Sequence, residues 1–355
     1  MAEGDAVTAE VREQASGAAI EAGVRELSGI AEAEWGVRAR PGKRGLTLDD
    51  IRIGSYGEIP DSTRRATYLP RGAAPRPGVA SVGYTIRDRA DVWAENATFL
   101  YEEALQRQWS SATDIPWREL TELPEDLERA MCQLCTYLTE VEFIAGDVPG
   151  KWIPQIPSEY FEAKLFLATQ VMDEARHFDV FRKRALANGG GLLQETGAAG
   201  LRNIMDGRDF SEMSAIMHVL SEGFVQSLFR CGEWIGQTDV DKRIFRMCAQ
   251  DESRHLAFGV MHLKYVLENE PERREEIHAY LDKGEGVLFT EIQDNAMFEA
   301  VAMLLGGGRG KLDLGVQKFL AVRKKQVNEY IHRLEVAGLG DRRERLPAFY
   351  SMFLN

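Results

Sequence analysis

The chain has 355 residues, of which 44% are hydrophobic and 28% charged, which is typical of a soluble globular protein with one large domain or two smaller ones. Its net charge of −13 argues against nucleic acid or an anionic membrane surface as a partner. The sequence has no apolar run of about 18 residues, and its acidic N-terminus lacks the apolar centre of a signal peptide. Since the four cysteines are few and unevenly spread, we expect a cytoplasmic protein.

Residues 1–89 are expected to form an N-terminal arm that is partly irregular. Residues 1–34 carry only a partial apolar stripe, which fits a short helix or a loose leader. Residues 36–90 contain stretches such as RPGKRG and LPRGAAPRPG, whose Gly and Pro content is typical of irregular chain. This part would cover the following domain, contact a partner subunit, or be disordered in part.

From about residue 90 onward the apolar residues recur at helical spacing, which predicts an all-α domain over residues 90–355. Pro149-Gly150 is expected to end one of its helices. Almost nothing favours a strand, so the predicted architecture is a four-helix bundle with additional flanking helices. The predicted helices cover residues 90–110, 127–147, 160–188, 211–234, 240–267, 285–305 and 316–336.

One five-residue sequence motif, which we refer to as a word, occurs in two of these helices. Residues 173–177 read D-E-A-R-H, and residues 251–255 read D-E-S-R-H. In each word a Glu and a His are three residues apart, so on a helix they share a face and can bind one metal ion. A single E-x-x-H is common on solvated helix faces, but two copies in long apolar-periodic helices indicate a metal site.

The aspartate that opens each word is expected to support the histidine. A metal-bound His needs its other ring N–H held, most often by a carboxylate. Asp173 and Asp251 are placed to be these partners, without binding the metal themselves.

A four-helix site of this kind needs one more Glu from the helix that precedes each word. Before the first word, Glu142 lies at the edge of the apolar stripe while Glu140 falls nearly opposite, so we favour Glu142. Before the second word, Glu222 lies among apolar residues, where a buried carboxylate needs a cation. Glu233 is the alternative, but it lies near the helix end, where exposure is easy.

The predicted site therefore has four carboxylates and two imidazoles around two metal ions, within a core of about residues 127–270. Oxygen-rich sets with few imidazoles suit iron or manganese better than zinc. We expect two iron ions, with manganese or a mixed Mn/Fe pair left open. The predicted ligands are Glu142, Glu174, His177, Glu222, Glu252 and His255.

At these residues the sequence resembles the ferritin-like di-iron carboxylate superfamily, over about residues 90–270. The D-E-x-R-H word is most similar to the pattern of bacterial multicomponent monooxygenase hydroxylases. Ribonucleotide reductase small subunits and related di-iron oxidases and N-oxygenases belong to the same group. The stretches E-F-I-A at 142–145 and S-E-G at 221–223 stand where the group places its other Glu ligands. The resemblance implies a bundle that activates O2.

The sequence departs from the group at three positions. Gln226 stands where the hydroxylases carry a Thr, and Phe181 where a reductase small subunit usually keeps its radical Tyr. Cys248 stands where aryl-amine N-oxygenases add a His. His218, one turn before Glu222, is either an extra ligand or site-lining residue or a hydrogen-bonded core histidine.

The function expected from this resemblance is an O2-dependent oxygenase or oxidase that acts on a small organic substrate, by C–H hydroxylation or N-oxygenation. Because the chain has no flavin or iron–sulfur motif, its electrons would come from an external reductase or ferredoxin. A radical-generating reductase-like small subunit is the alternative, and an iron-binding ferroxidase is a second one. By analogy with the group we expect a homodimer.

Overall fold

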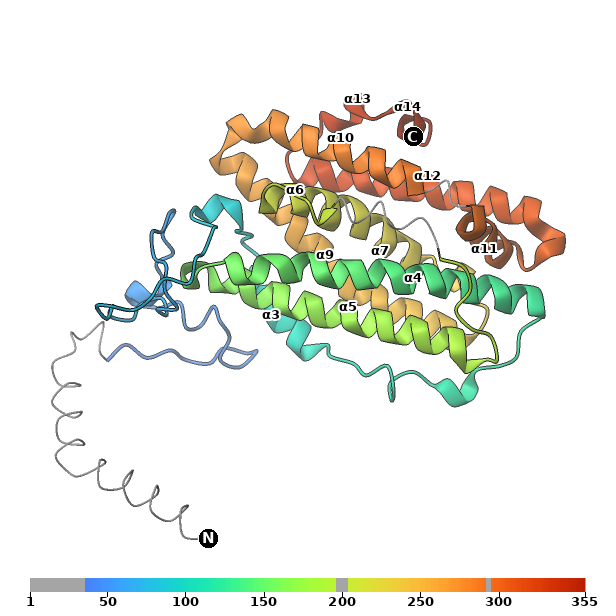
Figure 1. Cartoon of the computed structure of the whole chain (residues 1–355), viewed down its shortest axis with the longest axis horizontal. Coiled ribbons are helices and arrows are strands. Elements are labelled where there is room, and N and C mark those ends of the chain that lie inside the picture. Colours follow the sequence, from blue (N-terminus) through green and yellow to red (C-terminus); the bar gives the residue numbers. More distant parts are fainter. Residues whose placement is uncertain (1–35, 196–203, 292–294, 355) are drawn as a thin grey trace, which may run out of the picture. The chain divides into compact units, whose positions relative to one another are not determined.

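The computed structural model describes residues 36–195, 204–291 and 295–354, and the predicted leader at 1–34 lies outside them. The described residues contain helices and two isolated β-bridges but no strand, so the all-α prediction is confirmed (Figure 1). Among the described helices, none combines the length and the apolarity needed to cross a bilayer.

The described chain divides into two compact units. The smaller unit, residues 36–58 and 67–81, is irregular apart from a 3-10 turn at Gly54–Gly57. The larger unit, residues 59–66 and 82–354, contains every described α-helix. All the side chains discussed below belong to this larger unit.

Helices α4 (Glu125–Trp152) and α5 (Phe161–Ala187) form the first long pair and lie side by side in Figure 1, with α9 crossing behind them. The prediction that Pro149-Gly150 ends α4 is wrong, because the helix continues to Trp152. Val148, Pro149 and Trp152 are buried there, and this packing outweighs the hydrogen bond that proline removes.

The second long pair consists of an interrupted segment and helix α9 (Asp239–Asn269). The segment begins with α6 (Phe210–Ser214), widens into a π-helical stretch at Ala215–Ser221 and continues as α7 (Glu222–Arg230). We predicted one helix over 211–234, but the chain breaks at Cys231 before the short α8 (Gly232–Ile235). A Thr238–Asp241 capping box starts α9.

The remaining helices flank these pairs. Helix α3 (Ala97–Gln106) is shorter than the predicted 90–110, because Asp88 and Asp91 close a separate 3-10 turn before it. The helix predicted at 285–305 is replaced by α10 (Arg274–Glu291) and α11 (Asn295–Gly306). The other elements are α12 (Leu312–Val336), α13 (Arg342–Arg345) and α14 (Ala348–Ser351).

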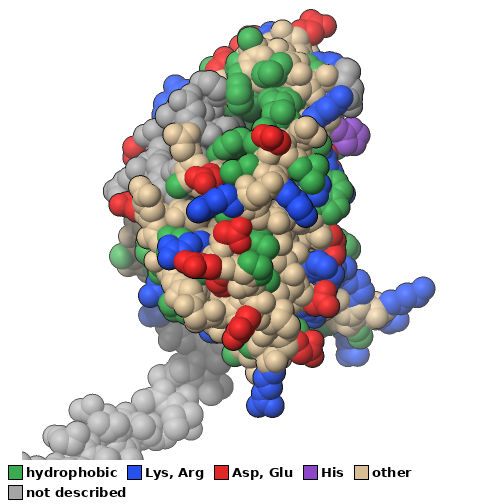
Figure 2. All heavy atoms as spheres, turned by 90° about the vertical axis from the view of Figure 1, so that its right-hand side faces the viewer, with side chains coloured by type: hydrophobic (Ala, Val, Ile, Leu, Met, Phe, Trp, Pro, Cys, Tyr) green, Lys and Arg blue, Asp and Glu red, His purple; other side chains and the backbone are tan. Residues whose placement is uncertain are grey.

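The first part of α10, residues 274–284, was not predicted. Two glycines lower the helix propensity of α10, and Gly284 serves close packing. A Cβ on Gly284 would come within 3.0–3.1 Å of side-chain atoms of Ile216 and Leu220, so α10 lies close against the π-helical stretch. On the face drawn in Figure 2, Lys and Arg alternate with Asp and Glu, so this face carries no continuous basic patch for nucleic acid.

Candidate metal centre

The structure brings all six predicted ligands together in the middle of the larger unit. They form two groups, in each of which the candidate ligand atoms lie within 4.8 Å of one another. Glu174 and Glu252 belong to both groups. The first group adds Glu142 and His177, and the second adds Glu222 and His255. All six side chains are buried.

Around His177, three carboxylates converge on the Nδ1 atom. The nearest oxygens of Glu174 and Glu252 both lie 3.2 Å from it, and Glu142 Oε2 lies at 3.7 Å. Helix α4 supplies Glu142, α5 supplies Glu174 and His177, and α9 supplies Glu252.

The surroundings of His255 repeat this arrangement. Its Nδ1 lies 3.1 Å from Glu174 Oε1, 3.3 Å from Glu252 Oε2 and 3.6 Å from Glu222 Oε2. Glu174 and Glu252 therefore each turn one oxygen towards one imidazole and the other oxygen towards the second. This is the donor arrangement of two adjacent metal positions that share two carboxylates.

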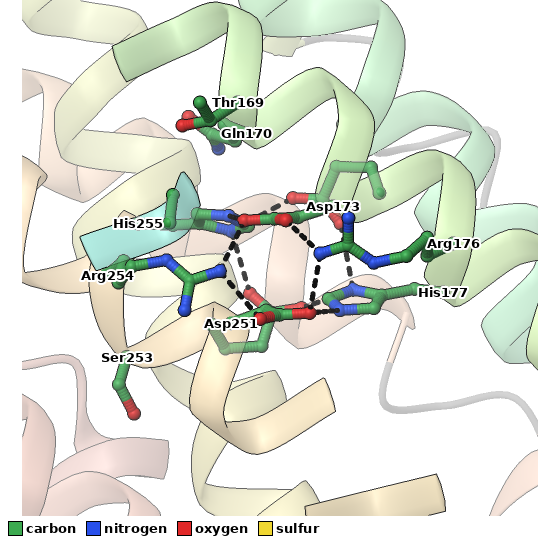
Figure 3. A network of polar contacts seen from close by, with 12 residues as sticks. Thr169, Gln170, Asp173, Arg176, His177, Asp251, Ser253, Arg254 and His255 are labelled. Atoms are coloured by element: carbon green, nitrogen blue, oxygen red, sulfur yellow. Dashed lines mark hydrogen bonds and ion pairs between the residues drawn. The ribbon is translucent and has the colours of Figure 1, made fainter. Parts of the chain in front are cut away.

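The opposite ring nitrogen of each histidine contacts an aspartate, but the pairing is crosswise (Figure 3). His177 Nε2 lies 3.3 Å from Asp251 of the other word, and His255 Nε2 lies 3.2 Å from Asp173. Each Nε2–H donates to its aspartate, which leaves Nδ1 as the atom that would bind metal. Without metal the surrounding acidic groups raise the pKa of both histidines well above the usual range, so Nδ1 also carries a proton and faces the carboxylates as a donor.

Two arginines neutralise the two aspartates, and the four side chains form the central ring of Figure 3. Arg254 donates to Asp173 at 2.7 Å and to Asp251 at 2.6 Å. Arg176 bonds the same two aspartates, at 3.1 Å to Asp251. The indole of Trp109 also donates to Asp251, at 2.7 Å. The ring thus locks α5 to α9 directly behind both histidines.

The six residues pass a test of fit for metal on their own chemistry. Glu142 Oε1, Glu174 Oε1 and Glu222 Oε2 are buried without a hydrogen-bond partner. Burial raises the pKa of Glu142 and of Glu222 well above the usual range of a carboxyl. Such groups need a cation.

The balance of charges at the site also favours bound cations. The two arginines compensate the two aspartates, so four glutamates remain without a fixed positive charge nearby. Two divalent cations would balance these four charges.

An apolar pocket reaches the site from one side. Its cavity has a volume of about 30 Å³, which is room for one or two water molecules. Glu142, Glu174, Glu222 and Glu252 supply its charged lining, and among the described lining residues Ser221 alone carries a hydroxyl. The apolar lining consists of Val141, Ile144, Ala145, Val148, Ile204, Met217 and Val225.

The remaining predicted residues lie around the site, outside both groups. His218 is fully buried and hydrogen-bonded to Gln170 and Ser214. Burial and the neighbouring His255 lower its pKa to about 3, so it is neutral. Gln226 donates to Ser253 and lines a separate groove. Phe181 packs against Phe229, with ring centroids 5.5 Å apart.

Sequence reasoning missed Arg176, Arg254, Trp109 and Gln170. The arginine of D-E-x-R-H repeats in both words, and this repetition was an available signal. No sequence signal pointed to Trp109 or Gln170, because their contacts depend on how separate helices pack.

No family model matches the sequence, and no curated protein matches it. Solved structures do match. One is a variant of R2-like ligand-binding oxidase with an aerobically reconstituted Mn/Fe cofactor, 16% identical, with a TM-score of 0.54 over 69% of this chain and 94% of that chain. Another variant of this oxidase, with an Fe/Fe cofactor, has a TM-score of 0.52 at the same identity and coverage.

This likeness establishes the fold, and it confirms the predicted ferritin-like bundle. The matched oxidases carry Mn/Fe or Fe/Fe cofactors. This chain has two buried carboxylate and histidine clusters whose atoms could bind metal.

Proposed function

We propose that the protein is an O2-dependent oxidoreductase with two metal ions, iron or one manganese and one iron, that acts on a small organic substrate. The observation that carries the proposal is the pair of buried ligand groups that share Glu174 and Glu252. The Mn/Fe and Fe/Fe cofactors of proteins with the same fold support it.

The contacts of the candidate ligands indicate which metal ion each would bind. Glu142 and His177 would hold one ion, Glu222 and His255 the other, and the two shared glutamates both. When bound, two such ions supply two electrons to O2. The protein keeps the ligands in place, since Asp251 and Asp173 hold the Nε2 protons of the two histidines.

The apolar lining of the pocket favours a substrate that is apolar where it meets the site, and the lining side chains must move to admit one, because the cavity holds only about 30 Å³. Its described lining has no Lys, Arg or His, so the proposed metal ions would be the positive charge that these residues present to an anionic group. Its apolar walls would exclude water from the reacting part. Both C–H hydroxylation and N-oxygenation remain within this proposal, with electrons from a separate reductase or ferredoxin.

The alternative of a radical-generating small subunit has less support. The position one helical turn after His177, which would carry a radical tyrosine, is occupied by Phe181, which has no phenol. It is buried among Phe229 and Phe245, at ring distances of 5.5 and 6.0 Å. Nothing in the described structure favours an iron-storage role.

Metal content of the purified protein, followed by anaerobic Fe(II) loading and rapid mixing with O2, tests the proposal. We expect about two metal ions per chain and a transient visible absorption. Candidate apolar substrates should shorten the lifetime of this absorption. Glu174→Ala and His255→Ala should lose metal, whereas Glu140→Ala, on the same helix as Glu142 but in neither group, should keep it. Equal metal binding by Glu174→Ala and the parent would refute the site.

A further inference from the structure

A row of buried polar side chains lies behind Glu222. Gln170 Nε2 donates to Glu222 Oε1 at 2.7 Å, and Gln170 Oε1 lies 3.1 Å from His218 Nε2. His218 Nδ1 in turn lies 3.0 Å from the Ser214 hydroxyl. All four residues are buried, and none of Gln170, His218 and Ser214 belongs to the ligand groups.

The direction of every hydrogen bond in this row follows from Glu222, the residue at which the row ends. A metal-bound Glu222 is ionised and only accepts, so the amide nitrogen of Gln170 points at it and the amide oxygen points away. That oxygen needs a donor, which makes Nε2 the protonated nitrogen of His218. Nδ1 then accepts from Ser214. A neutral imidazole satisfies both bonds, in agreement with the low pKa of His218.

Three elements are shaped to bring this row together. Gln170 lies one turn before Glu174 on α5, on the His255 side of the network in Figure 3. His218 and Glu222 lie within and directly after the π-helical stretch, a type of distortion that is frequent at functional sites. Opposite them α9 has Gly259, where a Cβ would lie 2.3 Å from the Cβ of His218.

The other half of the site has no such support. Glu142 corresponds to Glu222, yet its Oε1 is buried without a hydrogen-bond partner. Its Oε2 faces only His177 Nδ1, at 3.7 Å. In Glu222 the unpartnered atom is Oε2, which faces His255 Nδ1 at 3.6 Å. Glu222 is thus fixed through one oxygen by Gln170 and offers the other, whereas no described residue outside the ligand groups holds either oxygen of Glu142.

We propose that Gln170 and His218 are positioning residues that hold Glu222 with Oε2 towards the metal position beside His255, so that the two metal positions are unequal. The proposal rests on the metal site put forward above. It predicts that Glu222 binds through one oxygen, while Glu142 can change between one- and two-point binding.

Anaerobic titration with Co(II) alone, read by visible absorption, tests this without any turnover. Glu142→Ala removes a ligand of the metal position beside His177 and keeps the position beside His255 intact. Glu222→Ala does the reverse. In the Glu142→Ala background, adding Gln170→Leu should weaken Co(II) binding about 10–100-fold, as loss of a ligand's supporting hydrogen bond does. In the Glu222→Ala background the same change should leave the affinity within about twofold of its value, since the row ends at Glu222.

A second pair of variants separates positioning from packing. His218→Leu should weaken the position beside His255 as Gln170→Leu does. His218→Gln should restore most of the affinity, because its amide N–H can donate where Nε2 of the imidazole donates. If Gln170→Leu does not fold by circular dichroism, this pair carries the test.

The outcomes separate the two proposals. If the parent binds no Co(II), both the metal site and the positioning role are wrong. If the parent binds two ions and Gln170→Leu weakens both positions equally or neither, the positioning role alone is overturned. Failure of a folded His218→Gln to recover affinity overturns it as well.

Discussion

Two buried arginines contribute stability through the charges that they compensate. Arg254 is 3% exposed and bonds both aspartates of the network. Because Arg176 would then be the one arginine left to compensate Asp173 and Asp251, we expect Arg254→Leu to destabilise the metal-free protein by about 3–5 kcal/mol. Urea unfolding followed by circular dichroism measures this change.

The matched control is Arg246, whose partner is Glu233 and whose side chain is 51% exposed. Arg246→Leu should cost less than about 1 kcal/mol, since water solvates both charges of such a pair. Similar losses for the two variants would contradict the role given to the network.

His262 makes stability depend on pH outside the metal site. It is fully buried, donates to the Trp93 carbonyl and accepts from Ser211. Burial lowers its pKa to about 4, although the Trp93 carbonyl opposes this shift. Between the unfolded pKa of about 6.5 and this value, the unfolded chain binds a proton that the folded chain does not, so stability falls as pH falls.

His262→Gln keeps a polar side chain that cannot ionise, so it isolates this effect. Between about pH 7 and pH 4, the unfolding free energy of the parent should decrease by about 3 kcal/mol more than that of the variant. Urea titrations across this range measure the difference. Parallel pH profiles would show that His262 is not the titrating group.

At the scale of the elements, the close approach of α9 to the π-helical stretch depends on one glycine. Gly259→Ala would place a Cβ 2.3 Å from the Cβ of His218. Neither atom is the end of a flexible side chain, so the helices must separate, and we expect a loss of about 1–3 kcal/mol. Thermal unfolding of the metal-free protein checks this.

Gly150, inside α4, is the control because a Cβ there would meet nothing within 4 Å. Gly150→Ala should stabilise the protein by up to about 1 kcal/mol through helix propensity alone. If Gly259→Ala were equally well tolerated, the packing of α9 against the π-helical stretch would be looser than described.

The same elements show which features a sequence can predict. Glu174 and His177 repeat with the period of one helix, so their common face is visible in the letters. Glu142 and Glu222 followed from the apolar stripes around them, which each helix also carries by itself. Four ligand-bearing helices could therefore be predicted one at a time.

Features that arise between helices could not be predicted this way. The crosswise pairing of Asp173 with His255 depends on how α5 faces α9. The π-helical stretch at Ala215–Ser221 interrupts a regular apolar pattern that reads as one helix. Gln170 acquires its role only because that stretch brings His218 within 3.1 Å of it.

At the scale of the whole molecule, the proposed metal ions connect α4, α5, α7 and α9, because each of these helices contributes at least one ligand. An unfolded chain cannot present these ligands together, so binding should stabilise the folded state. With free Mn(II) at about 100 times the dissociation constant, under anaerobic conditions, we expect about 2.7 kcal/mol per occupied position.

Urea unfolding with Mn(II) and after treatment with a chelator measures this stabilisation. Glu174→Ala removes a ligand that both positions share, so its unfolding curve should not respond to Mn(II). Glu140→Ala should respond as the parent does. If the parent unfolds at the same urea concentration with and without Mn(II), the four glutamates are not joined by metal. The burial of Glu142 and Glu222 would then have to be explained by protonation, as their raised pKa values would indicate.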